Sequence, residues 1–376
     1  MMKKILFVTG TRADYGKMSI LANRLLTEDY DVNFFVTGMH MMSEYGGTYV
    51  EIRDSGYQQA YEYINQRAGD PQDLVLSKTI FGFSDYIHEH KPDLVMIHGD
   101  RIEALACAIV CATNYVLCGH VEGGEVSGTI DEVYRHCNTK LSSHHFVCSQ
   151  DAKRRLVSLG EEQARLHVIG SPELDFHARP SGATLEEAKK YYQIPFDDFG
   201  IVIMHSVTSE QETMREQALA LFSALKASGR NFVVVSPNND PGSSDIKAII
   251  DSMPAERFRH IPSLRFSFFS ELLRHASAMI GNSSTGVREA PFLGVPSLNL
   301  GTRQTNRAHA KSITNALCTE REAIDRFLSE EWGKRYPKDT TFGTGGSAES
   351  FVKVLADESF WDIPRQKYFH EEVPTP

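Results

Sequence analysis

Short apolar runs alternate with amphipathic stretches along most of the chain. Runs rich in β-branched residues predict parallel strands, because strands covered on both faces are apolar throughout. In the first half these predicted strands are residues 5–9, 32–37, 94–98, 115–120, 145–148 and 167–170. Helix-like segments separate most of them, so the pattern predicts a doubly wound α/β domain.

The same alternation starts again after residue 200. It predicts strands at residues 200–205, 232–237, 259–262, 278–281 and 297–300, separated by helical segments such as 212–227 and 246–253. The chain has 376 residues, and a single hydrophobic core rarely extends beyond roughly 250–300 residues. We therefore expect two Rossmann-like domains, residues 1–171 and residues 172–354. We expect the closing segment, residues 355–376, to pack back on the first domain.

The two predicted sheets are expected to face each other across a cleft. In open α/β sheets, ligands bind outside the carboxyl ends of the strands. The residues that follow the predicted strands are polar, and they form the segments 10–17, 98–101, 120–125, 204–206, 237–240 and 281–289. These loops are the expected site.

Composition and charge narrow the classes of partner. A net charge of −10, with 41% hydrophobic and 23% charged residues, is typical of a globular protein and gives no basic footprint for nucleic acid or an anionic membrane. The apolar run near the start is too short for a signal peptide, and the most apolar window, residues 104–118, is too short for a membrane helix. Six cysteines without a Cys-x-x-Cys pair read as reduced core residues, so a cytoplasmic protein is expected.

Several segments come close to familiar motifs but lack a residue or spacing that each motif requires. The loop 10–17 has one residue too many between its glycines for a Walker A loop, and Met18 replaces the magnesium-binding hydroxyl. No strand is followed by Gly-x-Gly-x-x-Gly, which disfavours a nicotinamide cofactor. Ser283 lacks the glycine of a nucleophile elbow, and no His-Glu-x-x-His pair exists for zinc. The sequence therefore predicts neither cofactor nor metal.

The segment 281–289 indicates an anion site. A strand ending in Gly281 runs into Asn-Ser-Ser-Thr-Gly and then Val-Arg-Glu, which places hydroxyls and free N–H groups at a helix start. Ser283 and Ser284 could bond a diphosphate and Glu289 could accept from ribose hydroxyls, while plain helix capping remains the alternative. Arg12 and Arg303, which follow other predicted strands, favour an anion-binding site over plain helix capping.

Three acids follow strand ends in the first domain: Asp100, Glu122 and Asp131. Neighbouring carboxylates push their pKa values apart, so one can act as an acid and another as a base, as in glycosidic-bond chemistry. His205, at the tip of the first strand of the second domain, could protonate a leaving phosphate oxygen. The histidines that flank the acids are expected to orient carboxylates or satisfy backbone groups; they are His98, His120 and His136.

Together the motifs resemble the hydrolysing UDP-N-acetylglucosamine 2-epimerases of bacterial sialic acid synthesis. The matching stretches are Gly10-Thr11-Arg12-Ala13-Asp14-Tyr15-Gly16-Lys17, His98-Gly99-Asp100-Arg101, His120-Val121-Glu122-Gly123-Gly124-Glu125, Thr129-Ile130-Asp131, Arg135-His136 and Gly281-Asn282-Ser283-Ser284 with Arg288-Glu289. Non-hydrolysing relatives usually carry Pro-Glu, Thr and Ala-Gly where this chain has Ala13-Asp14, Arg101 and Gly123-Gly124. Gly343-Thr344-Gly345 departs from the family's usual Gly-Asp-Gly.

The resemblance implies a glycosyltransferase-B-like fold, a homodimer or homotetramer, and conversion of UDP-GlcNAc and water to N-acetylmannosamine and UDP. By the same resemblance Asp100, Glu122, Asp131 and His205 take part in the reaction. The residues assigned to binding UDP and the sugar are Arg12, Arg101, His136, Asn239, Ser283, Ser284, Glu289 and Arg303.

Three alternatives stay open. A similar hydrolysing epimerase acts on UDP-2,4-diacetamido-2,4,6-trideoxyglucose in legionaminic acid synthesis, and residues around His40, Met41, Met42 and Tyr45 would decide between the sugars. A retaining glycosyltransferase would release UDP only with an acceptor. A silent nucleotide-sugar sensor would bind without turnover.

Overall fold

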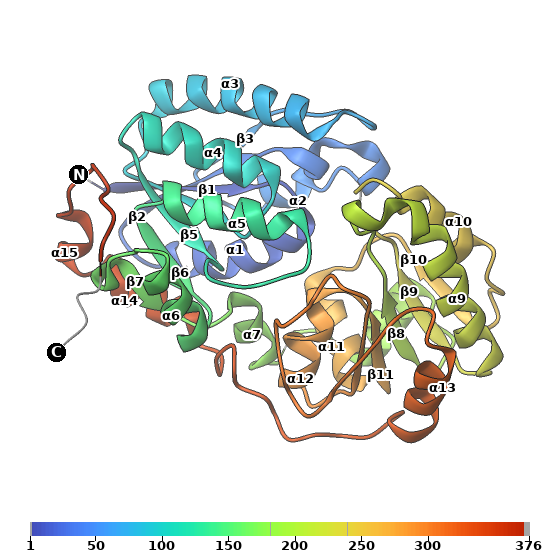
Figure 1. Cartoon of the computed structure of the whole chain (residues 1–376). Helices are drawn as coiled ribbons and strands as arrows, with labels where there is room; N and C mark the ends of the chain where they lie inside the picture. Colours follow the sequence, from blue (N-terminus) through green and yellow to red (C-terminus); the bar gives the residue numbers. More distant parts are fainter. Residues whose placement is uncertain (1, 181, 239, 372–376) are drawn as a thin grey trace. The chain divides into compact units, whose positions relative to one another are not determined.

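The computed structural model describes residues 2–180, 182–238 and 240–371, which form two compact units (Figure 1). The first unit comprises the described residues of Met1–Glu125, Asp131–Asp175 and Phe342–Pro376, and the second those of Val126–Ile130 and Phe176–Thr341. The chain thus leaves the first unit after Asp175 and returns to it at Phe342, where the sequence predicted divisions after residues 171 and 354.

A seven-stranded parallel sheet, in the order β3-β2-β1-β4-β5-β6-β7, forms the centre of the first unit. Its strands are β1 (Lys3–Thr9), β2 (Tyr30–Val36), β3 (Gln59–Glu62), β4 (Leu94–His98), β5 (Leu117–Val121), β6 (His144–Val147) and β7 (Leu166–Val168). The helices around it are α1 (Arg12–Leu25), α2 (Tyr49–Arg53), α3 (Gln72–His90), α4 (Ile102–Thr113), α5 (Ile130–Leu141), α6 (Gln150–Ser158), α14 (Ser347–Leu355) and α15 (Glu358–Trp361), and α7 (Pro172–His177) leads out of it.

Helices cover both faces of this sheet, as the apolar strand pattern predicted. Alternate residues of β1 enter different clusters, since side chains along a strand point to opposite faces. Ile5 and Phe7 pack with α1 and α14, whereas Leu6 and Val8 pack with α3 and α4. The doubly wound α/β fold of the first unit is confirmed.

The second unit repeats this architecture with six parallel strands in the order β10-β9-β8-β11-β12-β13. The strands are β8 (Gly200–Ile203), β9 (Phe232–Val235), β10 (Phe258–Ile261), β11 (Ala278–Gly281), β12 (Ser297–Leu300) and β13 (Ile313–Ala316). The helices are α8 (Leu185–Tyr192), α9 (Met214–Ala227), α10 (Ser243–Asp251), α11 (Phe266–His275), α12 (Glu289–Phe292) and α13 (Arg321–Glu330). Both strand orders are Rossmann-like, with the reversal beside the first strand of each unit.

Two edge strands were missed in the sequence. The strands β3 and β13 read Gln-Ala-Tyr-Glu and Ile-Thr-Asn-Ala. All four residues of β3 and three of the four residues of β13 are only half-buried or exposed. These residues form no apolar run, whereas the other two edge strands, β7 and β10, carry apolar residues and were predicted.

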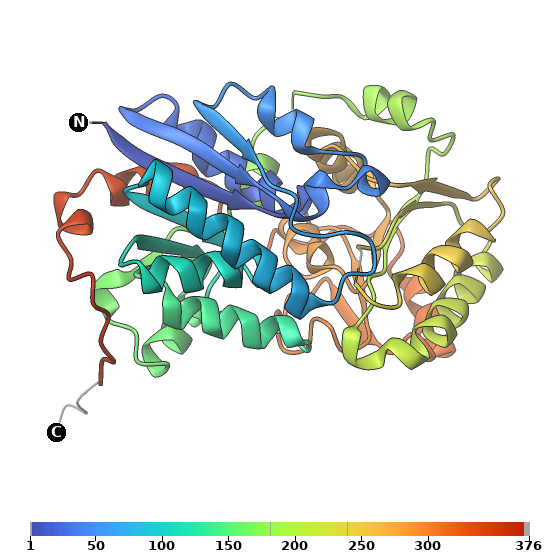
Figure 2. The same ribbon diagram turned by 90° about the horizontal axis from the view of Figure 1, so that it is seen from above.

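The C-terminal helices belong to the first unit. In Figures 1 and 2 the red helices α14 and α15 lie beside the blue strands at the N-terminal end. The hydroxyl of Tyr30 donates to the carbonyl of Leu355 (3.0 Å), and Phe351 is fully buried in the cluster that contains Phe7. Residues Ser347–Leu355 form α14, and the separate short helix α15 follows at Glu358–Trp361.

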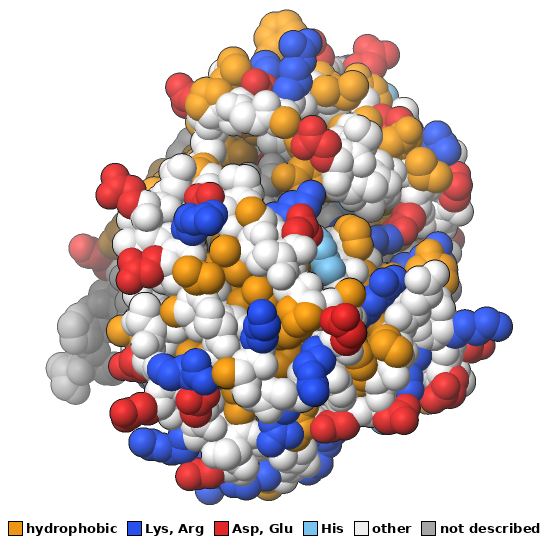
Figure 3. Space-filling view, turned by 90° about the vertical axis from the view of Figure 1, so that its right-hand side faces the viewer, with side chains coloured by type: hydrophobic (Ala, Val, Ile, Leu, Met, Phe, Trp, Pro, Cys, Tyr) orange, Lys and Arg blue, Asp and Glu red, His pale blue; other side chains and the backbone are white. Residues whose placement is uncertain are grey.

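The cysteines are mostly buried, as the sequence predicted. Five of the six cysteines are buried and Cys137 is exposed. Among the described residues, no helix combines the length and apolarity that crossing a membrane requires. On the face drawn in Figure 3, basic and acidic side chains are interspersed among hydrophobic ones.

Candidate active site

The strand order of each sheet reverses beside its first strand, and polar loops gather there. In the first unit the reversal lies between β1 and β4, so the loops after Thr9 and His98 flank it. In the second unit it lies between β8 and β11, flanked by the loops after Ile203 and Gly281. Crevices at such points are the usual ligand sites of open α/β sheets.

Glu122 follows β5 in an uncommon backbone conformation. Its φ is 72°, in the left-handed region, which costs a non-glycine residue roughly 1–2 kcal/mol. The residue is only 3% exposed. Strain of this kind persists only where the surroundings hold it, and it directs this carboxylate away from the path of the strand.

Two basic side chains contact the Glu122 carboxylate. Oε2 of Glu122 lies 2.8 Å from Nζ of Lys17 and 2.7 Å from Nε2 of His98. Lys17 also lies 3.6 Å from Glu173, which is buried and accepts from the Ser171 hydroxyl at 2.7 Å. The ammonium group of Lys17 therefore offsets the charge of two buried carboxylates, of which Glu173 was missed in the sequence.

Asp100 forms an ion pair with Arg135, a buried arginine of α5. Arg135 also donates to the carbonyl of Glu125 at 3.1 Å. Burial lowers the pKa of Arg135, but the charges of Asp100 and Glu122 outweigh this and raise it above its usual value. Asp100 and Glu122 follow β4 and β5, which are neighbouring strands, so both acids lie at the same edge of the first sheet.

Asp131 lies in the first turn of α5, and Arg135 follows it one turn later. Residues four apart share a helix face, so Asp131 lies on the Arg135 side of α5. His136 lies beside Glu132, with 3.4 Å between Nε2 and Oε1. Its predicted contact with substrate stays a prediction.

His120 supports the backbone of the acid loop. Its Nε2 lies 2.8 Å from the carbonyl of Gly99 and its Nδ1 lies 3.2 Å from the hydroxyl of Thr139. Burial lowers the pKa of His120 to about 3, so the ring is neutral and Nε2 donates to that carbonyl. Asn138 donates to the same carbonyl at 3.0 Å. The expectation that the flanking histidines satisfy backbone groups is confirmed for His120.

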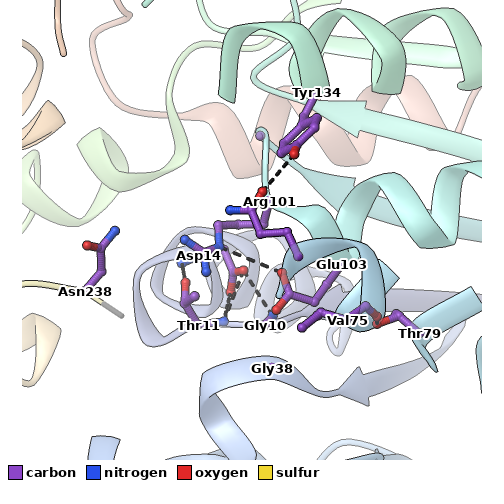
Figure 4. Close-up of polar contacts among 12 residues, drawn as sticks. Gly10, Thr11, Asp14, Gly38, Val75, Thr79, Arg101, Glu103, Tyr134 and Asn238 are labelled. Carbon is purple, nitrogen blue, oxygen red and sulfur yellow. Dashed lines mark hydrogen bonds and ion pairs between the residues drawn. The ribbon is translucent and has the colours of Figure 1, made fainter. Parts of the chain in front are cut away.

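The loop after β1 is held from within (Figure 4). Asp14 accepts from the backbone N–H groups of Gly10 (3.1 Å) and Thr11 (3.2 Å), which caps α1. Gly38, with φ 63°, closes against this loop: a Cβ there would lie 2.5 Å from the carbonyl oxygen of Gly10, so only glycine fits. His40 is fully buried and contacts Thr9 at 2.9 Å. The structure thus places this proposed sugar-pocket residue in the interior.

Both predicted arginines of the first unit have acidic neighbours. Arg12, the first residue of α1, forms an ion pair with Glu51 of α2. Arg101 precedes α4, and its Nε lies 3.8 Å from Oε2 of the buried Glu103 (Figure 4). Their predicted contacts with UDP stay predictions.

His205 follows β8 and is held by Asn282 from the end of β11. The backbone N–H of His205 donates to Asn282 Oδ1 at 2.7 Å, and Asn282 Nδ2 donates to the His205 carbonyl at 2.8 Å. The N–H of Asn238 donates to Nδ1 of His205 at 3.2 Å, so the proton of the neutral ring is on Nε2. Asn239, a predicted binding residue, lies outside the described residues.

The segment after β11 makes a short turn with a capping serine. Gly281 has φ 128°, and a Cβ there would lie 2.0 Å from the carbonyl oxygen of Ile203, so glycine lets β11 approach β8. Ser283 accepts from the N–H of Thr285 at 3.4 Å and caps the 3₁₀ turn that begins at Ser284. Arg303 donates to the carbonyl of Asn282 at 3.2 Å, which places its guanidinium beside this turn.

Glu289 is held on both carboxylate oxygens. Oε1 accepts from the hydroxyl of Thr285 at 2.7 Å, and Oε2 lies 2.6 Å from Nε2 of His177. Nδ1 of His177 contacts the hydroxyl of Ser270 at 2.8 Å. His177 comes from α7, 112 residues earlier in the chain, and no local motif marks it, so the sequence did not reveal it.

A family model described as "UDP-N-acetylglucosamine 2-epimerase" matches residues 24–356. The chain belongs to this 2-epimerase family. A "UDP-N-acetylglucosamine 2-epimerase" of Neisseria meningitidis is 43% identical over 98% of this chain and 99% of its own length. A "UDP-N,N'-diacetylbacillosamine 2-epimerase (hydrolyzing)" of Legionella pneumophila is 32% identical over 94% and 96%.

Solved structures with 2-epimerase descriptions share the fold. The N. meningitidis UDP-GlcNAc 2-epimerase bound to UDP-GlcNAc superposes with a TM-score of 0.75 at 20% identity, over 94% of this chain and 99% of that one. The Methanocaldococcus jannaschii enzyme in complex with UDP-GlcNAc and UDP gives a TM-score of 0.79 at 19% identity, with the same coverage. The glycosyltransferase-B-like class expected from the sequence agrees with this fold.

Proposed function

We propose that this 2-epimerase family member is hydrolysing and converts UDP-GlcNAc and water to N-acetylmannosamine and UDP. The observation that carries the proposal is the group of charged side chains that follows the neighbouring strands β4 and β5, in which Asp100 pairs with Arg135 and Glu122 pairs with Lys17. Family membership and the 43% identity to a UDP-N-acetylglucosamine 2-epimerase support the substrate. The loop residues Ala13-Asp14, Arg101 and Gly123-Gly124 support the hydrolysing branch.

Two steps account for inversion at C2. The C2 hydrogen of a 2-acetamido sugar is not acidified by an adjacent carbonyl, so its removal is coupled to departure of UDP from C1, which develops positive charge beside it. A carboxylate of the site accepts the C2 proton, and the C2–H electron pair forms the C1–C2 double bond of 2-acetamidoglucal. The C1–O bond breaks, and its electron pair leaves with UDP. Water then adds, with hydrogen delivered to C2 from the opposite face and hydroxyl to C1.

We assign these proton transfers to Asp100, Glu122 and Asp131. Acids in different surroundings can hold different protonation states, which two transfers to opposite faces require. We assign His205 to the departing diphosphate, because its Nε2 carries the proton and Nδ1 is already occupied. The remaining binding assignments stay as predicted, with Glu289 on the ribose and Arg303, Ser283 and Ser284 on the phosphates.

The test is proton NMR of the purified protein with UDP-GlcNAc in deuterium oxide, without added metal or cofactor. We expect UDP and free N-acetylmannosamine that carries deuterium at C2. Formation of UDP-ManNAc would instead assign the protein to the non-hydrolysing branch. Release of UDP with C2–H retained would contradict the elimination mechanism.

A second substrate is tested beside the first. One relative, which is 32% identical, is named a hydrolysing UDP-N,N'-diacetylbacillosamine 2-epimerase. The competing substrate is therefore UDP-2,4-diacetamido-2,4,6-trideoxyglucose. We expect a higher kcat/KM with UDP-GlcNAc. A higher value with the diacetamido sugar would change the substrate while keeping the reaction.

A further inference from the structure

Four side chains of the second unit form a continuous hydrogen-bonded row that passes through Glu289. In order they are Ser270 on α11, His177 on α7, Glu289 at the start of α12, and Thr285 before it. Ser270 and His177 are almost wholly buried, at 0% and 2% exposure, and Glu289 retains 6%. The row thus runs from the interior to a carboxylate that still reaches the surface.

The chemistry of the row fixes the direction of its hydrogen bonds. A carboxylate only accepts, so Nε2 of His177 carries a proton and donates to Oε2 of Glu289. In the neutral ring, Nδ1 then accepts from the Ser270 hydroxyl. On the other oxygen, the hydroxyl of Thr285 is the donor. Each carboxylate oxygen therefore uses one acceptor position and keeps another.

His177 is itself fixed at three places. Its ring lies 5.7 Å from that of Phe266, its Nδ1 contacts Ser270, and its carbonyl accepts from Arg274 at 2.8 Å. Because the imidazole cannot turn without breaking buried contacts, it holds the plane of the Glu289 carboxylate. A glutamate with three rotatable bonds would otherwise sample several orientations.

We propose that His177 is a positioning residue for nucleotide recognition: it orients Glu289 so that the remaining acceptor positions receive both hydroxyls of the ribose. This inference rests on the proposed function, in which Glu289 binds ribose. His177 does not touch the nucleotide and acts only through Glu289. A ribose with both hydroxyls is thereby preferred over one that lacks the 2′-hydroxyl.

The test compares two amide substitutions that differ in where they place an N–H group. The amide nitrogen of His177→Gln falls near the position of Nε2 and can still donate to Glu289, whereas that of His177→Asn falls near Nδ1 and cannot. The measurement is the affinity for UDP and for 2′-deoxy-UDP by isothermal titration calorimetry. Its readout is the ratio of the two affinities, which a general loss of stability does not change.

We expect the unaltered protein to prefer UDP by roughly tenfold or more, as for a hydrogen bond to a charged group. His177→Gln should keep most of this preference, while His177→Asn should lower the ratio to within about threefold of unity. Ser270→Ala, which removes the anchor but not the donor, should lie between them. His275→Asn, at an exposed histidine of α11, is the matched control and should leave the ratio unchanged.

The outcomes distinguish the ribose-binding role of Glu289 from the positioning role of His177. If the unaltered protein does not distinguish UDP from 2′-deoxy-UDP, or if Glu289→Gln keeps the full preference, the ribose role of Glu289 is wrong. If that role holds but folded His177→Asn keeps the ratio, the positioning role of His177 is wrong. Should His177→Asn fail to fold, Ser270→Ala decides: an unchanged ratio there overturns the proposal.

Discussion

At the scale of single residues, substitutions of two acids in the first unit distinguish a role in the reaction from a role in binding UDP. Asp100 and Glu122 each have a basic partner, Arg135 and Lys17, within the same group. Asp100→Asn and Glu122→Gln keep the shape of each side chain and remove its ability to exchange a proton. We expect turnover to fall by roughly 10³-fold or more while the Kd for UDP changes less than about threefold. Rapid-quench assays and calorimetry measure the two quantities.

A conservative change outside this group provides the control. Glu89→Gln removes a carboxylate from the exposed side of α3 and should leave both turnover and UDP affinity unchanged. A large loss of UDP affinity in Asp100→Asn would give that residue a structural role. Turnover within about tenfold of normal in both variants would remove these acids from the mechanism.

Lys17 permits a second prediction at this scale. Its ammonium group lies between Glu122 (2.8 Å) and Glu173 (3.6 Å), and its side chain is 12% exposed. Lys17→Met keeps the length of the side chain but leaves two buried carboxylates without this cation. Removing one member of a buried ion pair costs about 3–5 kcal/mol, so we expect a loss of this size in urea unfolding. Stability within about 0.5 kcal/mol of normal would show that the contact contributes little.

At the scale of elements, one carboxylate attaches the returning chain to the first unit. Asp175 accepts from three consecutive N–H groups at the start of α14, those of Gly346 (2.7 Å), Ser347 (2.8 Å) and Ala348 (2.9 Å). The first turn of a helix leaves these groups without partners in the helix itself, and a negative charge there also interacts favourably with the helix dipole. This cap joins segments 171–173 residues apart in the chain.

Asp175→Ala should therefore destabilise the first unit by about 2 kcal/mol or more, measured by urea unfolding. Asp175→Asn, which can still accept, should lose less. Asp151→Asn is the control, because Asp151 is an exposed first-turn acid of α6 and should change stability by less than about 0.5 kcal/mol. Equal effects of Asp175→Ala and Asp151→Asn would contradict the cap.

At the scale of the whole molecule, buried histidines set the response to acid. Burial lowers the pKa of five of them to between about 3 and about 4; they are His40, His120, His144, His145 and His167. Each pKa is about 6.5 in the unfolded chain, so between about pH 6.5 and 4 the unfolded state binds more protons. The stability from neutral burial is present above about pH 6.5 and is lost as the pH falls through this window.

We therefore expect the urea midpoint to fall steadily from pH 7 to pH 5. For each buried histidine, the free energy of unfolding falls by on the order of 3 kcal/mol over the full pH window. Local opening that exposes the ring to water makes this loss smaller. Far-UV circular dichroism at matched ionic strength measures the midpoint. His275→Gln, at an exposed histidine, should not change the slope. A midpoint constant between pH 7 and pH 5 would contradict the assignment.

The central strands of both sheets and the polar loops at the strand ends were determined by the sequence alone. Apolar runs, helical periodicity and turn residues are local properties, so they can be read from neighbouring letters. The motif residues Asp100, Glu122, Ser283 and Glu289 were found for the same reason. The edge strands β3 and β13 were missed because their polar, poorly buried residues form no apolar run.

Only the tertiary structure decided which of these residues have partners. Lys17 contacts Glu122 from 105 residues away, His177 reaches Glu289 across 112, and Asp175 caps a helix more than 170 residues later. The structure also showed that His40 is interior and that the chain returns to the first unit at Phe342 rather than after residue 354. Such contacts arise because the chain packs distant segments together, and the free energy of a buried charge depends on what packing places beside it rather than on its neighbours in sequence.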